Sequence, residues 1–181
     1  LTFANLLVSK ITVNAENSSC EDTVNFVNVI GDIDLVSITN SFSDALDIDF
    51  SKLKIDKINI TSALNDCADF SAGNYILGSL NLKNCGDKAL SVGEKSFVKL
   101  ETINASNANL GIASKDSSIV QATEVNLDNL ETCVAAYNKK QEYYGGFIEI
   151  KKMSCKNYSR KADIDINSKI LEKNIKLTND I

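Results

Sequence analysis

The side chains with the clearest chemical potential lie in three short polar segments that recur about every 22 residues. They read GEKS at 93–96, SKDS at 114–117 and YNKK at 137–140, and an insertion, QEYYGG, follows the third. Lysines can hold the carboxylates of acidic sugars, and tyrosine rings offer flat apolar surface to a sugar. These segments predict a saccharide-binding site that consists of Glu94, Lys115, Asp116, Tyr137, Asn138, Lys139, Lys140, Tyr143 and Tyr144.

Two reactions would be open to this site if it were catalytic, with Glu94, Lys115 and Asp116 as the candidate residues. A polysaccharide lyase needs a base, which Lys115, Lys139 or Lys140 could supply if burial lowered its pKa. A glycoside hydrolase needs two carboxylates roughly 5 to 9.5 Å apart, which Glu94 and Asp116 could provide. The structural alternative is that opposite charges on neighbouring segments neutralise each other and end strands.

A second polar group is acidic and lies earlier in the chain. Its members are Asp44, Asp47, Asp49, Asp66, Asp69 and Asp87. Ca²⁺ prefers oxygen ligands and can bridge carboxylates that would otherwise repel one another, so Asp47, Asp49 and Asp69 are candidate calcium ligands. Aspartates that bond turn backbone are the simpler interpretation. Beyond this calcium hypothesis the sequence predicts no metal or cofactor.

Several absences restrict the function. The chain has no histidine, which excludes a Ser-His-Asp triad and histidine metal ligation. Its single arginine and lack of tryptophan count against efficient sugar catalysis. The net charge of −5 argues against a nucleic-acid partner. No apolar run approaches the length of a membrane span, so we expect no membrane insertion.

The five cysteines, Cys20, Cys67, Cys85, Cys133 and Cys155, show no zinc-site spacing. We interpret them as buried, reduced thiols that pack as small apolar side chains. Because they occupy comparable positions in the repeat, disulfides between neighbouring coils are the alternative.

The polar segments must be positioned by a repeating scaffold. Apolar residues alternate with polar ones over short runs and recur about every 22 residues, in columns such as Ile11, Ile33, Ile55, Leu77, Leu100, Ala122 and Ile150. Two further columns begin at Val36 and Ile38 and end at Ile175 and Leu177. Alternation indicates strands, and fixed recurrence indicates a solenoid. The absence of proline agrees with backbone pairing almost everywhere.

An asparagine column marks one corner of each coil. It contains Asn40, Ser62, Asn84, Asn107, Asn129, Asn157 and Asn179. Asparagine tolerates left-handed backbone conformation, and its amide can bond the next asparagine along the stack. The sequence therefore predicts an all-β, right-handed parallel β-helix of about eight coils of roughly 22 residues. A leucine-rich repeat is the alternative, but no segment offers its helical half.

The segments GDKALSVGEKS, LGIASKDSS and AAYNKKQEYYGG, within 86–146, resemble motifs of bacterial right-handed parallel β-helix repeat proteins. Such motifs are associated with cell-surface and polysaccharide-related proteins, including some with a CotH-type kinase-like domain. The resemblance covers about a third of the chain and implies the pectin-lyase-like superfamily. That superfamily contains enzymes, adhesins and tailspikes, so the fold does not decide the function.

We expect residues 1–181 to form one domain of a longer chain, secreted or attached to a cell surface. The last coil ends in the strand-like segment NIKLTN, which suggests a neighbouring domain at the C-terminal end. The favoured function is binding of a polysaccharide or surface glycan without chemistry. A polysaccharide lyase or glycoside hydrolase, and a structural spacer or adhesin stalk, are the alternatives.

Overall fold

The computed structural model describes residues 1–179, which form strands and turns. The strands are β1 Thr2–Ala4, β2 Leu7–Ser18, β3 Asp22–Val27, β4 Ile30–Ser41, β5 Asp44–Asp49, β6 Lys52–Ala63, β7 Ala68–Ser71, β8 Asn74–Cys85, β9 Lys88–Gly93, β10 Phe97–Lys115, β11 Ile119–Tyr137, β12 Phe147–Ile164, β13 Lys169–Glu172 and β14 Ile175–Lys176. Because no helix occurs among the described residues, the leucine-rich-repeat alternative is wrong.

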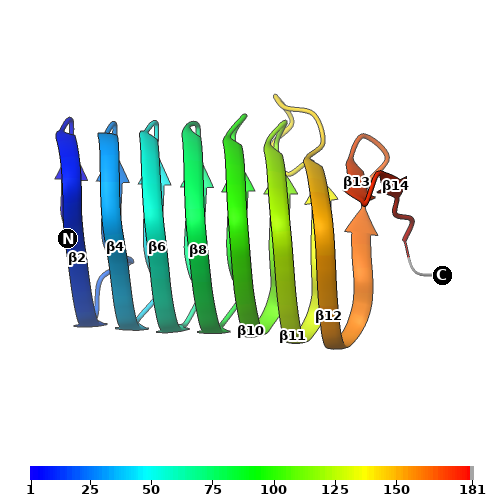
Figure 1. Cartoon of the computed structure of the whole chain (residues 1–181), viewed down its shortest axis with the longest axis horizontal. Helices are drawn as coiled ribbons and strands as arrows, with labels where there is room; N and C mark the ends of the chain where they lie inside the picture. The colour runs from blue at the N-terminus through cyan, green and yellow to red at the C-terminus, as the bar shows by residue number, and fades with distance from the viewer. Residues whose placement is uncertain (180–181) are drawn as a thin grey trace.

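The strands stack into a parallel β-solenoid of about eight turns with about 22 residues per turn. Each strand pairs in parallel with its equivalent one coil along, as β4 does with β2 and β6. In Figure 1 the labelled stretches of β2 to β12 run downward in front, and the stretches behind them run upward as the chain advances from left to right. This sense is that of a right-handed coil, the usual hand of parallel crossover connections.

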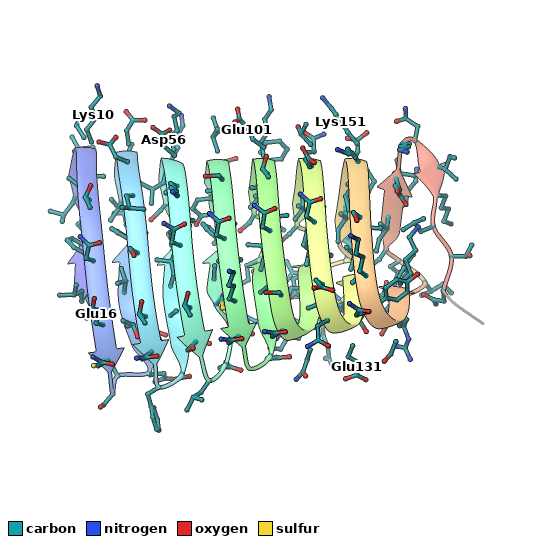
Figure 2. All side chains as sticks on the ribbon, turned by 60° about the horizontal axis from the view of Figure 1, so that its bottom comes forward. Lys10, Glu16, Asp56, Glu101, Glu131 and Lys151 are labelled. Atoms are coloured by element: carbon teal, nitrogen blue, oxygen red, sulfur yellow. A yellow bond between two sulfur atoms is a disulfide. The ribbon has the colours of Figure 1, made fainter. Side chains whose placement is uncertain are left out.

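Each coil has three sides separated by corners. One corner is a pair of adjacent exposed residues that interrupts the alternation, such as Asp56 and Lys57 in β6; Lys10, Asp56, Glu101 and Lys151 mark this edge in Figure 2. A second corner is the asparagine column, where Asn84 has a φ of 57°. The third, which we call the upper corner, contains Asn5, Asn28, Phe50, Ala72, Glu94 and Asp116, all with positive φ.

The core is a narrow set of apolar columns along the solenoid axis. Ile55 pairs with Ile33 on one side and with Leu77 on the other, and Leu77 pairs with Leu100. These side chains are almost completely buried. Packing of neighbouring coils against each other is what buries an apolar face that one coil cannot bury alone. The columns predicted from the sequence are therefore confirmed through Ile150, Met153 and Cys155.

Asparagine side chains form the predicted ladder. Asn107 donates to the side-chain oxygen of Asn84 at 2.8 Å and accepts from Asn129 at 2.8 Å. A second ladder, which sequence analysis missed, runs along the outer face through Asn59, Asn81, Asn104 and Asn126. Amide ladders of this kind satisfy exposed polar side chains along the stack.

Four of the five cysteines form disulfides, so the prediction of reduced thiols is wrong for them. Cys67 bonds Cys85, and Cys133 bonds Cys155. Cys20 is a free, exposed thiol. Stacking brings residues one coil apart within the Cα separation that a disulfide needs, 5.3 Å and 6.4 Å here. The alternative of disulfides between neighbouring coils is therefore the correct one. Neither pair occupies equivalent positions, because the register partner of Cys85 is Ala63 and that of Cys155 is Leu127.

The C-terminal end departs from the repeat. β14 pairs antiparallel with β13, so Ile175 lies opposite Glu172 and does not extend its predicted column. Leu177 is partly buried against the core, and its backbone N–H donates to Ile170. The side chain of Asn179 bonds the backbone of Ile164, so its assignment to the asparagine corner is also wrong. This short hairpin, together with Leu177, lies at the C-terminal end of the core.

Candidate functional site

The candidate site lies where the upper corner meets the insertion loop, which we define as residues 138–146. Glu94 and Asp116 occupy equivalent turn positions one coil apart, with φ values of 57° and 56°. The backbone N–H of Lys95 donates to Asp116, and that of Asp116 donates to Tyr137. The structure therefore brings the three polar segments together in register. Figure 1 shows the loop that follows β11, in yellow, projecting beyond the row of corners.

Asp116 is completely buried and anchors the loop. Its carboxylate Oδ1 accepts from the backbone N–H groups of Lys139 and Lys140, each at 2.7 Å. Two such bonds fix the direction in which the chain leaves β11. Because the loop covers this carboxylate, a ligand would have to displace the loop to reach it.

Asn138 holds the loop closed from within. Its side-chain nitrogen donates to the carbonyl oxygens of Lys140, Tyr143 and Tyr144. Ser117 adds a reciprocal contact, since its side chain accepts from the Tyr144 N–H and its backbone N–H donates to the Tyr144 carbonyl, both at 2.8 Å. The insertion loop is thus bonded to the solenoid at both of its sides.

Two of the three lysines predicted for the site, Lys115 and Lys140, already pair with carboxylates. Lys140 forms an ion pair with Glu94 across the loop. Lys115, only 7% exposed, extends toward Asp69 two coils away, with Nζ 3.6 Å from Oδ2. The Lys115 side chain crosses Gly93, where an added Cβ would lie 2.8 Å from its Cε. A larger residue at this position would require the Lys115 side chain to shift.

These pairings bear directly on the catalytic alternatives. The hydrogen bond from Lys140 to Glu94 raises the pKa of Lys140, which is the opposite of what a catalytic base needs. Burial raises the pKa of the Tyr137 hydroxyl, which keeps that group neutral. Of the two carboxylates considered for hydrolysis, Glu94 is paired and Asp116 is covered.

The exposed groups of the site are at the tip of the loop. Tyr144 is 78% exposed. Lys139 and Lys140 are exposed as well, and Tyr143 is half-buried. The Lys95 ammonium lies 5.5 Å from the centroid of the Tyr143 ring, within the range of a cation–π contact. What the site presents outward is therefore an aromatic pair with lysines around it.

The acidic group lies on the adjacent side of the solenoid, which we call the third face. It is formed by β3, β5, β7, β9 and the C-terminal halves of β10 to β12. Asp47 pairs in register with Asp69, and Asp49 follows two residues after Asp47. No group of three or more carboxylate or cysteine side chains in residues 1–179 is arranged to hold a metal ion. Calcium binding by Asp47, Asp49 and Asp69 stays a prediction.

As the simpler interpretation expected, some of these aspartates accept hydrogen bonds from backbone N–H groups. Those N–H groups, however, belong to the next coil rather than to the same turn. Asp44 Oδ1 accepts from the N–H of Asp66, and Asp66 Oδ1 accepts from the N–H of Lys88, at 2.8 and 2.9 Å. Lys88, rather than Asp87, is the next member of this column. Burial raises the pKa of Asp66 to about 6, although the neighbouring Lys88 opposes the shift.

Sequence reasoning missed two participants. Asp69 belongs to the candidate site through Lys115, and Gly93 permits that contact. The sequence does distinguish Gly93, because it is the only glycine in its column, where its neighbours are Ser71 and Lys115. No described residues form a helix that could span a membrane. Comparisons with protein-family models, curated proteins and solved structures find no match.

Proposed function

We propose that this domain binds a polysaccharide or surface glycan, without chemistry, through the aromatic tip of the insertion loop. The observation that carries the proposal is Tyr144, a large ring that is 78% exposed on a loop bonded to the solenoid through Asp116, Asn138 and Ser117. Tyrosine provides rigid contact area at low entropic cost. A scaffold that fixes the loop in advance reduces the ordering cost of binding.

The covered and paired state of the polar groups favours binding over catalysis. Glu94, Lys115 and Asp116 have partners within the protein, whereas Tyr143, Tyr144 and Lys139 face outward. The two disulfides support a secreted or surface location, because disulfides persist in oxidising compartments.

A spacer without a ligand is the second candidate. The specific observation in its favour is that Lys140 of the loop already forms an ion pair with Glu94 within the protein. A loop that serves only to shield the buried Asp116 would show the same bonds.

A glycan array followed by titration calorimetry separates the candidates. We expect binding of at least one glycan class and at least a tenfold loss in the Tyr144→Ala variant. Tyr158→Ala is the matched control, because Tyr158 is 43% exposed on β12, outside the loop. Absence of binding across the array, or equal losses in both variants, would support the spacer. A product absorbing at 235 nm would instead indicate a lyase.

A further inference from the structure

The third face carries several carboxyl groups that no lysine or arginine of the described residues pairs with. Four half-buried aspartates on this face, Asp22, Asp44, Asp47 and Asp49, form no ion pair within residues 1–179. We call these four residues the acidic strip. Asp47 and Asp49 are two residues apart on β5, so their carboxyl groups lie on the same side of the strand. Burial and the neighbouring Asp49 raise the pKa of Asp47 to about 8, so this carboxyl group retains a proton when no cation is nearby.

Buried oxygen atoms without partners lie in the same row. Asn25, Asp47, Asp69 and Ser91 are successive register partners along the third face. Asn25 Oδ1, Asp69 Oδ1 and Ser91 Oγ are buried and have no hydrogen-bond partner. Ser91 is 0% exposed, and it alternates with the core residues Leu90 and Val92, so its hydroxyl points to the outer side. A buried acceptor without a hydrogen-bond partner lowers the stability of the protein, so a bound donor would stabilise these atoms.

Lysine ammonium groups of the protein already pair with other carboxylates of the third face. The Lys115 ammonium crosses two coils to approach Asp69, and the Lys88 ammonium lies between Asp66 and Asp87. An ammonium group carries three donors and no acceptor, which suits a row of carboxylate and amide oxygens. The strip formed by β3 and β5 offers the same oxygen chemistry without a lysine of its own.

The strip is continuous with the candidate glycan site. Glu94 of the upper corner is close enough to Asp49 to influence its carboxyl group electrostatically, and Glu94 also pairs with Lys140 of the insertion loop. At about 4.8 Å per coil, the three coils from Asp47 to the Lys115 coil span about 14 Å. An extended polymer held at the tyrosine tip could reach the strip along this edge.

We propose that the acidic strip binds the ammonium groups of an amino-sugar polymer whose rings contact the insertion loop. This inference rests on the proposed glycan-binding function and names its ligand class. It replaces the acidic sugars suggested by the lysines, because Lys115 and Lys140 pair with carboxylates within the protein. The strip, by contrast, has amide and backbone donors but no lysine partner.

The test is calorimetric titration of the whole chain, at neutral pH and low salt, with the glucosamine hexamer. We expect binding that is at least tenfold weaker for the fully N-acetylated hexamer, which lacks ammonium groups. The double variant Asp47→Asn, Asp49→Asn should lose at least tenfold in affinity for the glucosamine hexamer. Asp32→Asn, Asp34→Asn is the matched control, since it replaces the same number of carboxyl groups on β4, outside the strip. Thermal unfolding of each variant verifies its folding.

Each other outcome has a defined meaning. Equal binding of both hexamers, or an unchanged affinity in the strip variant, would overturn the inference. Spermidine that binds as tightly and depends on the strip would overturn the saccharide assignment, and a strip-dependent response to CaCl₂ alone would assign a metal ion instead. If Tyr144→Ala abolishes binding of other glycans while the strip variant behaves like the native chain, only this inference fails. If no glycan depends on Tyr144 but the hexamer still depends on the strip, the proposed function fails.

Discussion

Asp116, a candidate catalytic residue by its sequence, has a structural role in the folded protein. Its type and spacing suggested a partner for Glu94, but the carboxylate lies under the insertion loop and accepts two backbone hydrogen bonds. A buried carboxylate is tolerated when such bonds solvate its charge. The loop that covers Asp116 also carries Tyr144, whose side chain is exposed.

Replacing Asp116 by alanine should loosen the loop without unfolding the solenoid. Hydrogen bonds to a charged acceptor contribute about 1.5 to 3 kcal/mol each, so we expect the free energy of unfolding to fall by about 2 kcal/mol or more. Hydrogen exchange of the amides in 138–146 should accelerate. Glu142→Ala is the control, because Glu142 is exposed on the same loop. Native exchange rates in the Asp116 variant would contradict the anchoring role.

Asp47 should make stability depend on pH. Its pKa is about 8 in the folded protein against 3.8 for an ordinary aspartate, because burial and Asp49 disfavour the charged form. Between these values the folded state binds more protons than the unfolded state, so stability should fall as the pH rises from about 4 to about 8. Urea unfolding across this range should show a shallower dependence in Asp47→Asn. The exposed Asp34→Asn should keep the native slope.

Spacing predicted which candidate side chains would be neighbours but not which would remain available. Glu94 and Asp116 recur at one corner position, and the structure confirms that relation. The direction of Lys115 could not be read from spacing, because it depends on the room above Gly93 and on the charge of Asp69. The partner of a long side chain depends on the local space and charge around it, which the sequence repeat does not specify.

At the scale of elements, the asparagine corner combines two effects that can be separated. Asn107 has a φ of 58° and belongs to an amide ladder. Asn104 belongs to the other ladder, bonding Asn81 and Asn126, but lies in regular strand conformation. The pair therefore differs chiefly in backbone conformation.

Alanine at position 107 should destabilise the protein more than alanine at position 104. Both variants lose two side-chain hydrogen bonds, but only Asn107→Ala places a Cβ-bearing residue without a local polar side chain in left-handed conformation, at about 1 to 2 kcal/mol. Denaturant unfolding measures the difference, and Asn107→Gly should recover part of it. Equal losses at the two positions would show that the ladder alone stabilises the corner.

The sequence predicted the repeating strands better than the C-terminal end of the solenoid. The column from Ile11 to Ile150 is correct because a one-residue slip would turn apolar side chains outward. Beyond β12 the same period failed, since Ile175 is 69% exposed in an antiparallel hairpin. The disulfide of Cys67 and Cys85 was also hidden, because its separation of 18 residues joins the turn before β7 to the last residue of β8 rather than equivalent positions.

On the scale of the whole molecule, the solenoid is a linear stack in which each coil contacts mainly its neighbours. β8 pairs with β6 and β10, whereas β2 pairs only with β4. Stability in such a stack is close to a sum of coil and interface contributions. The two ends also differ, because the β13–β14 hairpin and Leu177 cover one end while Val8 and Ile11 at the other are only partly buried.

Local unfolding of the 181-residue chain should therefore begin at β2. Amides of β2 should exchange with solvent faster than those of β8, because an end coil can separate without opening the rest. Leu80→Ala in β8 should lower the free energy of unfolding by about 2 to 5 kcal/mol, since Leu80 is completely buried. Ile11→Ala in β2 should cost less and should accelerate exchange mainly in its own coil. Equal costs at Ile11 and Leu80, with uniform exchange along the stack, would mean that the solenoid unfolds as one cooperative unit.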